Sequence, residues 1–262
     1  MDKMYHIPLV GAIVIVCGSA ALLTDFYVSV PLVIFYTMMV IGNGVAAHRY
    51  FSHHQFTVNR VGQTILAVLS TFAAYASIHA WMAQHRQHHS HTDTNLDNHT
   101  PLKGLWHSFY FWKWDKNEIS PKAMGVIPFL RDRKSAMSVI ARDPIVLFLS
   151  KHFLKIWVIF LLLLFVVSPI LFFTYCIAYT IETIRMGILN ICAHTKLPTS
   201  YRLYPTNDQS YNNVIVGLLT FGFGWHNTHH AKPGKLILTE RWWEIDLEGY
   251  VGWLFSKVFP AR

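Results

Sequence analysis

Histidine is the residue type that points most directly to chemistry in this chain. The sequence holds 16 histidines in 262 residues, more than its 14 Asp and Glu together. Nine of them fall into short boxes, namely one H-x4-H, two H-x-x-H-H, and the last position of an N-x-x-x-H that begins at Asn190. These nine are His48, His53, His85, His88, His89, His194, His226, His229 and His230. Because neutral imidazole is the commonest metal ligand in proteins, this clustering predicts a metal centre.

The spacing inside the boxes is that of ligands on a helix. Residues at i, i+3 and i+4 share one helical face, so each H-x-x-H-H presents three imidazoles together. Asn190 and His194 are likewise one turn apart on one face. His48 and His53 would differ by about 140° on an α-helix. Either the helix ends between these two residues, or they reach different metals.

The number of histidines indicates more than one ion. Nine imidazoles exceed what one ion accepts, so we expect two metals with four or five nitrogens each, completed by Asn190 directly or through a water. Imidazole by itself does not select among zinc, copper, iron and nickel. The absence of E-x-x-H argues against a carboxylate-bridged di-iron bundle, and the absence of H-E-x-x-H against a zinc protease.

The elements that must position these boxes belong to an unusually apolar chain. It is 53% hydrophobic and only 14% charged, against about 25% charged in ordinary globular proteins. Several runs reach the roughly 20 apolar residues that a membrane-spanning helix needs. We therefore predict one all-α integral membrane domain with four transmembrane helices and a cytosolic helical cap. The helices are placed at 7–23, 26–47, 147–167 and 170–192, and the cap at 48–146 and 193–262.

The histidine boxes also constrain which other runs can cross the membrane. All nine imidazoles meet only if their boxes lie on one side, so no span can separate His53 from His85. The apolar run Val61–Gln84 is then expected to be interfacial or re-entrant, and Asn213–Trp225 to be interfacial. Thirteen of the 22 Lys and Arg fall between Arg49 and Lys155, against six acids. The positive-inside rule therefore places the cap on the cytoplasmic side of a multi-pass membrane protein.

The order of these boxes resembles that of the membrane fatty-acid desaturase family, in particular its stearoyl-type Δ9 branch. The segment 218–231 around the last box, the segment 242–247 and the segment 48–56 resemble it closely. The resemblance implies a di-iron centre held by the nine histidines, with Asn190 contributing through a water. It also implies four spans, a kinked tunnel for the acyl chain, and O2-dependent removal of two hydrogens to give a cis double bond.

The resemblance also bears on substrate, partners and location. Ala83-Gln84 stands before the second box, where animal acyl-CoA members carry Arg-Asp, and this is similar to the bacterial and cyanobacterial acyl-lipid type. The expected substrate is a fatty acyl lipid or an acyl-CoA, embedded among membrane lipids, with no role for nucleic acid. Electrons are expected from a separate donor such as ferredoxin or cytochrome b5. The membrane would be the cell inner membrane in a bacterium or the endoplasmic reticulum in a eukaryote.

Other residues near the boxes have less specific patterns. Trp81, Trp225 and Arg185 are candidates for lining the substrate route, although Arg185 can also pair with Glu182 three residues earlier on the same helix. The acids Asp93, Asp97 and Asp246 are candidates for orienting the imidazoles.

Two alternative functions remain open at this stage. One is a membrane di-iron hydroxylase or ketolase acting on a lipid or hydrocarbon. The other is a non-catalytic membrane protein that binds or transports metal.

Overall fold

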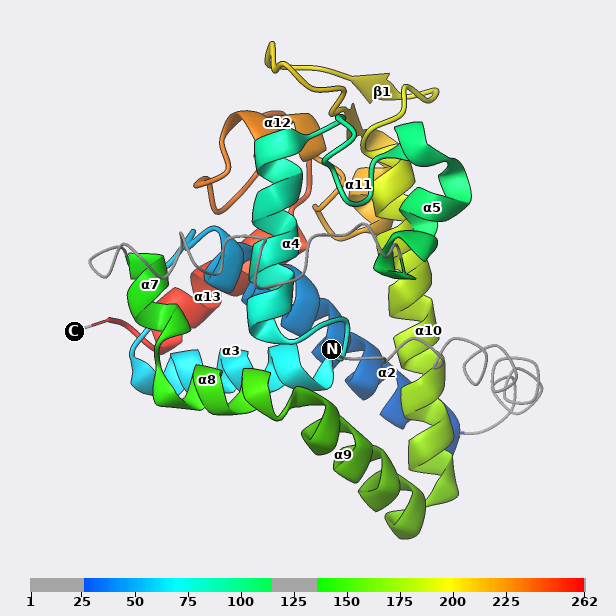
Figure 1. The fold of residues 1–262 in the computed structure, drawn as a ribbon, viewed down its shortest axis with the longest axis vertical. Helices are drawn as coiled ribbons and strands as arrows, with labels where there is room; N and C mark the ends of the chain where they lie inside the picture. Colours follow the sequence, from blue (N-terminus) through cyan, green and yellow to red (C-terminus); the bar gives the residue numbers. More distant parts are fainter. Residues whose placement is uncertain (1–25, 115–135, 262) are drawn as a thin grey trace.

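The fold was analysed in a computed structural model that describes residues 26–114 and 136–261. The first predicted span, 7–23, lies outside the described residues. The rest is mostly helical, as predicted, and the strands within the described ranges are two short ones, β1 (Ser200–Tyr201) and β2 (Asn212–Asn213), which pair antiparallel. Figure 1 shows the elements along the long axis of the molecule, with α9 at one end and α12 and β1 at the other.

The second predicted span, 26–47, is one continuous rod that runs on to Ser52. Its first part is the α-helix α2 (Phe26–Val40), and its second is the π-helix η1 (Ile41–Ser52). Together they form the one helix, among the residues described, that is long and apolar enough to cross a membrane. Nearly all of η1 is buried, whereas α2 exposes Val30, Val33 and Ile34. The rod therefore carries the first histidine box from an apolar end into the protein interior.

The apolar run Val61–Gln84 is broken into two helices. Helix α3 (Arg60–Phe72) is capped by the Asn59 side chain, and α4 (Ile78–His91) by the Ser77 hydroxyl. Ala74, between them, adopts a positive φ of 57° and interrupts helical hydrogen bonding. In Figure 1, α4 stands along the long axis and α3 lies across it. This run forms no single straight helix, and its interfacial or re-entrant placement remains a prediction.

The third predicted span, 147–167, is not one helix. Helix α8 (Pro144–Lys151) ends before His152, and α9 (Phe153–Val167) leaves at an angle of 71°. The bend has a packing reason, because α8 lies against α3 while α9 lies against α10. The indole of Trp157 on α9 donates a hydrogen bond to the hydroxyl of Tyr175 on α10 (2.7 Å). Both helices are apolar, so hydropathy alone predicts one span here.

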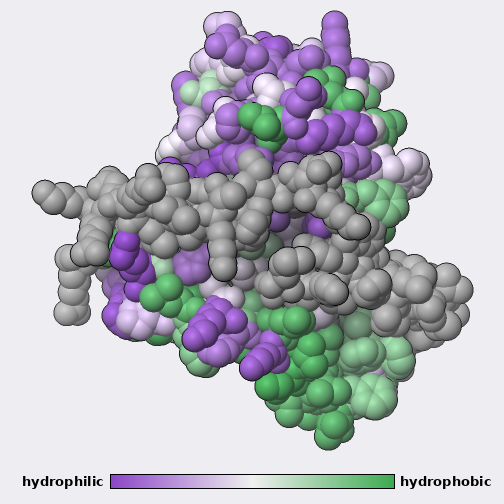
Figure 2. All heavy atoms as spheres, viewed as in Figure 1, coloured by the Kyte–Doolittle hydropathy of each residue, from purple (hydrophilic) through white to green (hydrophobic). Residues whose placement is uncertain are grey.

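The fourth predicted span, 170–192, matches helix α10 (Pro169–Cys192), and the turn before it lies at Ser168 as expected. Helix α10 packs along α2. Figure 2 shows hydrophobic residues gathered at the end of the molecule that holds α9, and hydrophilic residues at the opposite end. By length and hydropathy, the described part of the chain contains one helix that qualifies as a span, or two if the bent pair α8 and α9 counts as one. The number of four spans therefore remains a prediction.

The remaining elements are shorter helices. They are η2 (Pro101–Lys103), α5 (Leu105–Phe109), η3 (Phe111–Trp114), α7 (Ala136–Ala141), α11 (Val214–Leu219), α12 (His226–Ala231) and α13 (Leu247–Val258). The run Asn213–Trp225, expected to be interfacial, contains only the six residues of α11 followed by a tight turn. It is too short to cross a bilayer.

Candidate metal centre

Four helical segments that are far apart in the sequence bring the nine box histidines together. They are the end of η1, the second half of α4, the residues just after α10, and α12. The ring nitrogens converge in two groups. Group 1 is His48, His53, His85 and His229, with His89 adjoining it. Group 2 is His88, His194, His226 and His230.

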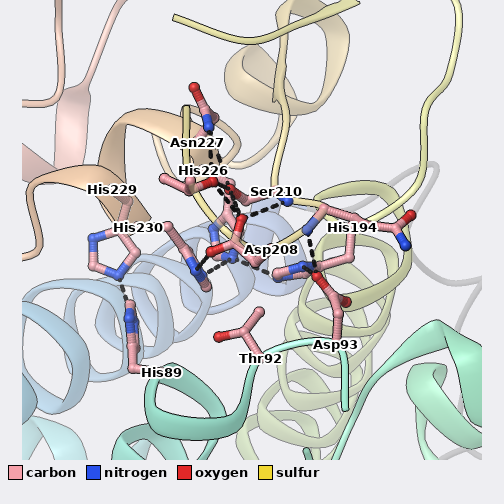
Figure 3. Close-up of polar contacts among 12 residues, drawn as sticks. His89, Thr92, Asp93, His194, Asp208, Ser210, His226, Asn227, His229 and His230 are labelled. Carbon is pink, nitrogen blue, oxygen red and sulfur yellow. Dashed lines mark hydrogen bonds and ion pairs between the residues drawn. The ribbon is translucent and has the colours of Figure 1, made fainter. Parts of the chain in front are cut away.

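Group 1 is assembled from three boxes. The Nε2 atoms of His53 and His85 lie 2.6 Å apart, and those of His48 and His229 lie 3.1 Å apart. His89 places its Nε2 3.1 Å from that of His85. It also places this atom 3.0 Å from the Nε2 of His229 (Figure 3). One H-x-x-H-H box is thus divided, with His85 and His89 in group 1 and His88 in group 2.

The pair His48 and His53 is brought together by the π-helical turn. The backbone N–H of His53 donates to the carbonyl of His48 at 3.2 Å, an i→i+5 hydrogen bond of the π type. Residues five apart therefore lie about one turn apart, and the two imidazole centroids are separated by 4.9 Å. The helix ends at Ser52, between them, and both histidines belong to the same group.

Group 2 joins the two H-x-x-H-H boxes to the residues just after α10. The Nε2 of His226 lies 3.0 Å from those of His194 and His230, and the Nε2 of His88 lies 3.3 Å from that of His230. Two nitrogens bound to one tetrahedral ion at 2.0–2.1 Å would lie roughly 3.4 Å apart. The spacing in group 2 is close to this value.

The hydrogen bonds behind the group 2 imidazoles favour tautomers that suit a bound cation. His88 directs its Nδ1 at both oxygens of Asp97 (3.0 Å each), and His230 directs its Nδ1 at Asp208 (2.9 Å). A neutral imidazole that donates from Nδ1 has a bare lone pair on Nε2. With both rings neutral and in this tautomer, the two facing Nε2 atoms cannot hydrogen bond to each other, and a shared cation would stabilise both lone pairs. The residues present therefore fit a metal.

The histidines are also held in the neutral form that a metal needs. Burial, followed by the neighbouring imidazoles and cations, lowers the pKa of seven of them well below the usual value of 6.5; these are His48, His53, His85, His88, His226, His229 and His230. The pKa of His89 is lowered to about 4, mainly by burial. Protons therefore compete weakly for these nitrogens near neutral pH.

Three carboxylates stand behind the imidazoles, and two of them were anticipated. Asp97 accepts from His88, and Asp93 accepts from Nδ1 of His194 at 3.2 Å (Figure 3). The prediction for the third acid, Asp246, was wrong, because its carboxylate pairs with Arg49 (2.7 Å) and not with an imidazole. Asp208, which pairs with His230, was missed. It lies 22 residues from that histidine in a loop, so no local spacing signals the contact.

Asn190 lies one turn before His194 and lines a small cavity that His85 of group 1 also lines. Its amide nitrogen donates to the carbonyl of Ser108 at 3.2 Å. Its contact with a metal through a water remains a prediction. In the described part of the chain, a further potential metal group combines His88, Asp97 and His99. It shares His88 with group 2, and Asp97 is the carboxylate that accepts from His88.

Of the two tryptophans predicted to line the substrate route, Trp81 lines the cavity and Trp225 does not. Trp81 lines it and stacks on His85, with centroids 6.1 Å apart and planes 10° apart. Trp225 is fully buried away from the cavity, and its indole donates to the carbonyl of Ile245 at 2.9 Å. The cavity is lined by Tyr75, Trp81, Gln84, His85, His99, Trp112, Met186 and Asn190.

The third predicted substrate residue, Arg185, belongs to a buried ion network. Its guanidinium bonds Glu182 at 2.8 Å through both Nε and Nη2, and bonds Glu248 at 3.0 Å. The carboxylate of Glu248 in turn lies 3.8 Å from Nε of Arg49, and Nη2 of Arg49 bonds the carboxylate of Asp246. All five side chains are 5% exposed or less. The i,i+3 pair expected on the helix is thus part of a larger network, and the contact of Arg185 with substrate remains only a prediction.

Comparison with known proteins agrees with this geometry. The family model for fatty acid desaturases matches residues 26–245. The chain is 31% identical over 222 residues to an sn-1 stearoyl-lipid 9-desaturase of Anabaena variabilis, covering 84% of this chain and 77% of that one. It is 28% identical over 246 residues to the Delta-9 acyl-lipid desaturase 2 of Arabidopsis thaliana (92% and 76%). It is also 28% identical over 262 residues to an acyl-CoA 5-desaturase of Anemone leveillei (95% and 75%).

The two histidine groups, the order of the boxes and these similarities lead to one conclusion. The chain belongs to the fatty acid desaturase family and is an oxidoreductase that desaturates fatty acyl chains.

Proposed function

We propose that the two histidine groups hold two iron ions, and that the chain introduces a cis double bond at the Δ9 position of a saturated acyl chain. The observation that carries this proposal is the facing of bare Nε2 lone pairs in group 2, beside a second set of imidazoles. Iron with O2 would supply the oxidation of the C–H bonds. The imidazoles of groups 1 and 2 would supply the nitrogens that hold the ions, and Asn190 would hold a water that contacts one of them.

The chain's own residues have two tasks in this reaction. The buried imidazoles keep protons off the ligand nitrogens, because the charged forms are poorly solvated there. Trp81 and Tyr75 form an aromatic wall of the cavity next to His85, with ring centroids 5.2 Å apart. Such a wall favours a hydrocarbon chain and excludes water from the reacting carbons. Trp225 and Arg185 would then act by supporting this site from outside the cavity.

We further propose four spans with the metal centre on the cytoplasmic side. Support comes from the apolar residues exposed on α2, α9 and α10, and from the basic excess between Arg49 and Lys155. A bilayer would cover the former, and the positive-inside rule assigns the latter to the cytoplasm. The rod of α2 and η1 would deliver its box directly to the membrane surface.

The carrier of the acyl chain is proposed to be a membrane lipid or CoA. The similar proteins named above act on stearoyl-lipid, acyl-lipid and acyl-CoA, and two of the three names specify the 9 position. The two electrons per turnover would come from a separate donor such as ferredoxin or cytochrome b5. A basic surface would steer an acidic donor towards the metal side.

The decisive experiment is expression in a host that lacks unsaturated fatty acids, followed by mass analysis of its lipids with mapping of the double bond. Loss of two hydrogens at C9–C10 in the wild type, and no product from His88→Ala, is the expected result. A gain of one oxygen would instead identify a hydroxylase. A double bond at another carbon would contradict the Δ9 assignment alone.

A further inference from the structure

The two histidine groups differ in what lies behind their imidazoles. Three of the four histidines in group 2 direct Nδ1 at a carboxylate, at distances of 2.9 to 3.2 Å. Within the described ranges, the group 1 histidines make no such contact with an Asp or Glu. The buried Nδ1 atoms of His48 and His229 in group 1, and that of His226 in group 2, have no hydrogen-bond partner there.

The three carboxylates are fixed by their own hydrogen bonds. Asp97 accepts from the backbone N–H groups of Asp93 and His99, at 3.0 and 3.2 Å. Asp208 accepts from the backbone N–H and the hydroxyl of Ser210, as Figure 3 shows. These acceptors are therefore in place before a metal binds.

Asp93 is positioned by its backbone as well. It adopts a φ of 58°, in the left-handed region that Asp and Asn tolerate better than most residues. Its carboxylate accepts from the backbone N–H of Gln209 at 2.6 Å, and the same oxygen faces His194. A strained conformation that aims a side chain at a ligand points to a role in the site.

A carboxylate behind a ligating imidazole raises the basicity of the nitrogen that binds the metal, and removing it typically costs 10–100-fold in affinity. We propose that group 2 holds its ion much more tightly than group 1, and that Asp93, Asp97 and Asp208 are the positioning residues that cause the difference. This inference rests on the two-metal centre proposed above.

Ligand number alone would favour the opposite order. Group 1 with His89 offers five imidazoles, whereas group 2 offers four. However, a bound cation makes each Nδ1–H a stronger donor, and group 1 has two buried Nδ1 atoms without an acceptor (His48 and His229), whereas group 2 has one (His226). Three independent carboxylate effects outweigh one additional neutral nitrogen, so group 2 is the tighter site.

The test is the release of iron from the purified full chain. The protein is loaded with Fe(II) without oxygen, excess ferrozine is added, and the absorbance of the iron–ferrozine complex is followed. Two equal phases are expected. His48→Ala should abolish the fast phase, and His226→Ala the slow one, which assigns each phase without changing any carboxylate.

Asp93→Asn, Asp97→Asn and Asp208→Asn should each accelerate the slow phase by about 10–100-fold and leave the fast phase unchanged. Asn keeps an acceptor oxygen, and at position 93 it also tolerates the positive φ. Glu240→Gln is the matched control, since it removes the same unit charge from a carboxylate bonded to Lys232 and Lys235.

Three outcomes would overturn the inference. They are a single release rate for both ions, loss of the slow phase in His48→Ala, or slow-phase rates that do not respond to any of the three Asp→Asn changes. Binding of fewer than two irons by the wild type would be a different failure, since it would overturn the proposed two-metal centre and the inference together.

Discussion

The carboxylate of Glu248 occupies the space in which a Cβ atom of residue 44 would lie. Gly44 is in the π-helix η1, one turn before the first histidine box, and an added methyl group would collide with all three carboxylate atoms. The glycine therefore allows α13 to bring a buried acid against the rod that carries His48. This acid completes the pairing of Arg185.

Gly44→Ala is accordingly expected to destabilise the fold. Overpacking in a buried site typically costs about 1–3 kcal/mol, and here it also pushes Glu248 from its arginine partners. The measurement is the midpoint of thermal unfolding in detergent. Gly234→Ala is the matched control, because nothing lies within 4 Å of its added Cβ. Equal unfolding midpoints for the two variants would contradict the prediction, because Glu248 could then move aside without loss of stability.

The ion network predicts a pH dependence of stability. Burial raises the pKa of Glu248 to about 7 from an ordinary 4.5; Arg185 and Arg49 oppose the shift, whereas Asp246 and Glu182 add to it. The folded chain therefore keeps a proton that the unfolded chain releases between these values. The free energy of unfolding contributed by this group should fall as pH rises from about 4.5 to 7, by up to about 3 kcal/mol.

The comparison that isolates this effect is the unfolding midpoint of wild type and Glu248→Gln from pH 5 to 8. The histidines of the centre act in the opposite direction, because their pKa values are lowered, so the difference between the two proteins is the relevant quantity. It should shift in favour of the variant as pH rises. Glu240→Gln is the control, since ion pairing lowers the pKa of Glu240 to about 2, outside this window. A constant difference would contradict the prediction.

The π-helical turn predicts different roles for two adjacent histidines. His53→Ala should remove one nitrogen of group 1, lower the iron content towards one ion per chain, and reduce desaturation by at least about 100-fold. His54 is next in sequence but contributes to neither group, and its φ is 50°. His54→Asn keeps that conformation accessible and should retain iron and activity. Iron bound by elemental analysis is the readout, and equal loss in both variants would exclude the assignment.

The sequence predicted the convergence of the boxes better than their division. Spacing of three and four residues is a local property of a helix, so the shared faces of the triple boxes follow from it. The split of one box, with His85 and His89 in group 1 and His88 in group 2, depends on how α4 packs against η1 and α12. No local pattern contains that information.

The other differences have similar physical causes. The bend at His152 arises because α8 and α9 pack on different partners, whereas both helices are apolar and their hydropathy alone does not reveal the bend. Asp208 and Glu248 reach their partners across 22 and 63 residues. Contacts between residues so far apart in the sequence are set by the tertiary fold. The sequence alone therefore could not distinguish Asp246, which pairs with Arg49, from Asp93 and Asp97, which contact imidazoles.

The two tryptophans proposed for the substrate route should behave differently on replacement. Trp81→Ala enlarges the cavity beside His85, so we expect retained iron but an altered distribution of product chain lengths. Trp225→Ala removes a fully buried ring that packs against Gly217, which typically costs about 3–5 kcal/mol. Lipid analysis and the unfolding midpoint separate the two effects. Unchanged products from a stable Trp81→Ala would remove Trp81 from the substrate route.

The shared metal centre predicts which surface positions lie on one side of the membrane. Thr57 follows the first box and Leu96 follows the second, and both side chains are exposed. Val167 ends α9, next to the turn at Ser168, and is 73% exposed at the apolar end of the molecule. In a chain without its native cysteines, Thr57→Cys and Leu96→Cys should react with an impermeant maleimide in inside-out vesicles only, and Val167→Cys in right-side-out vesicles only. Labelling of Thr57→Cys and Leu96→Cys from opposite sides would require a span between their boxes, and the imidazoles of η1 and α4 could then not share one ion.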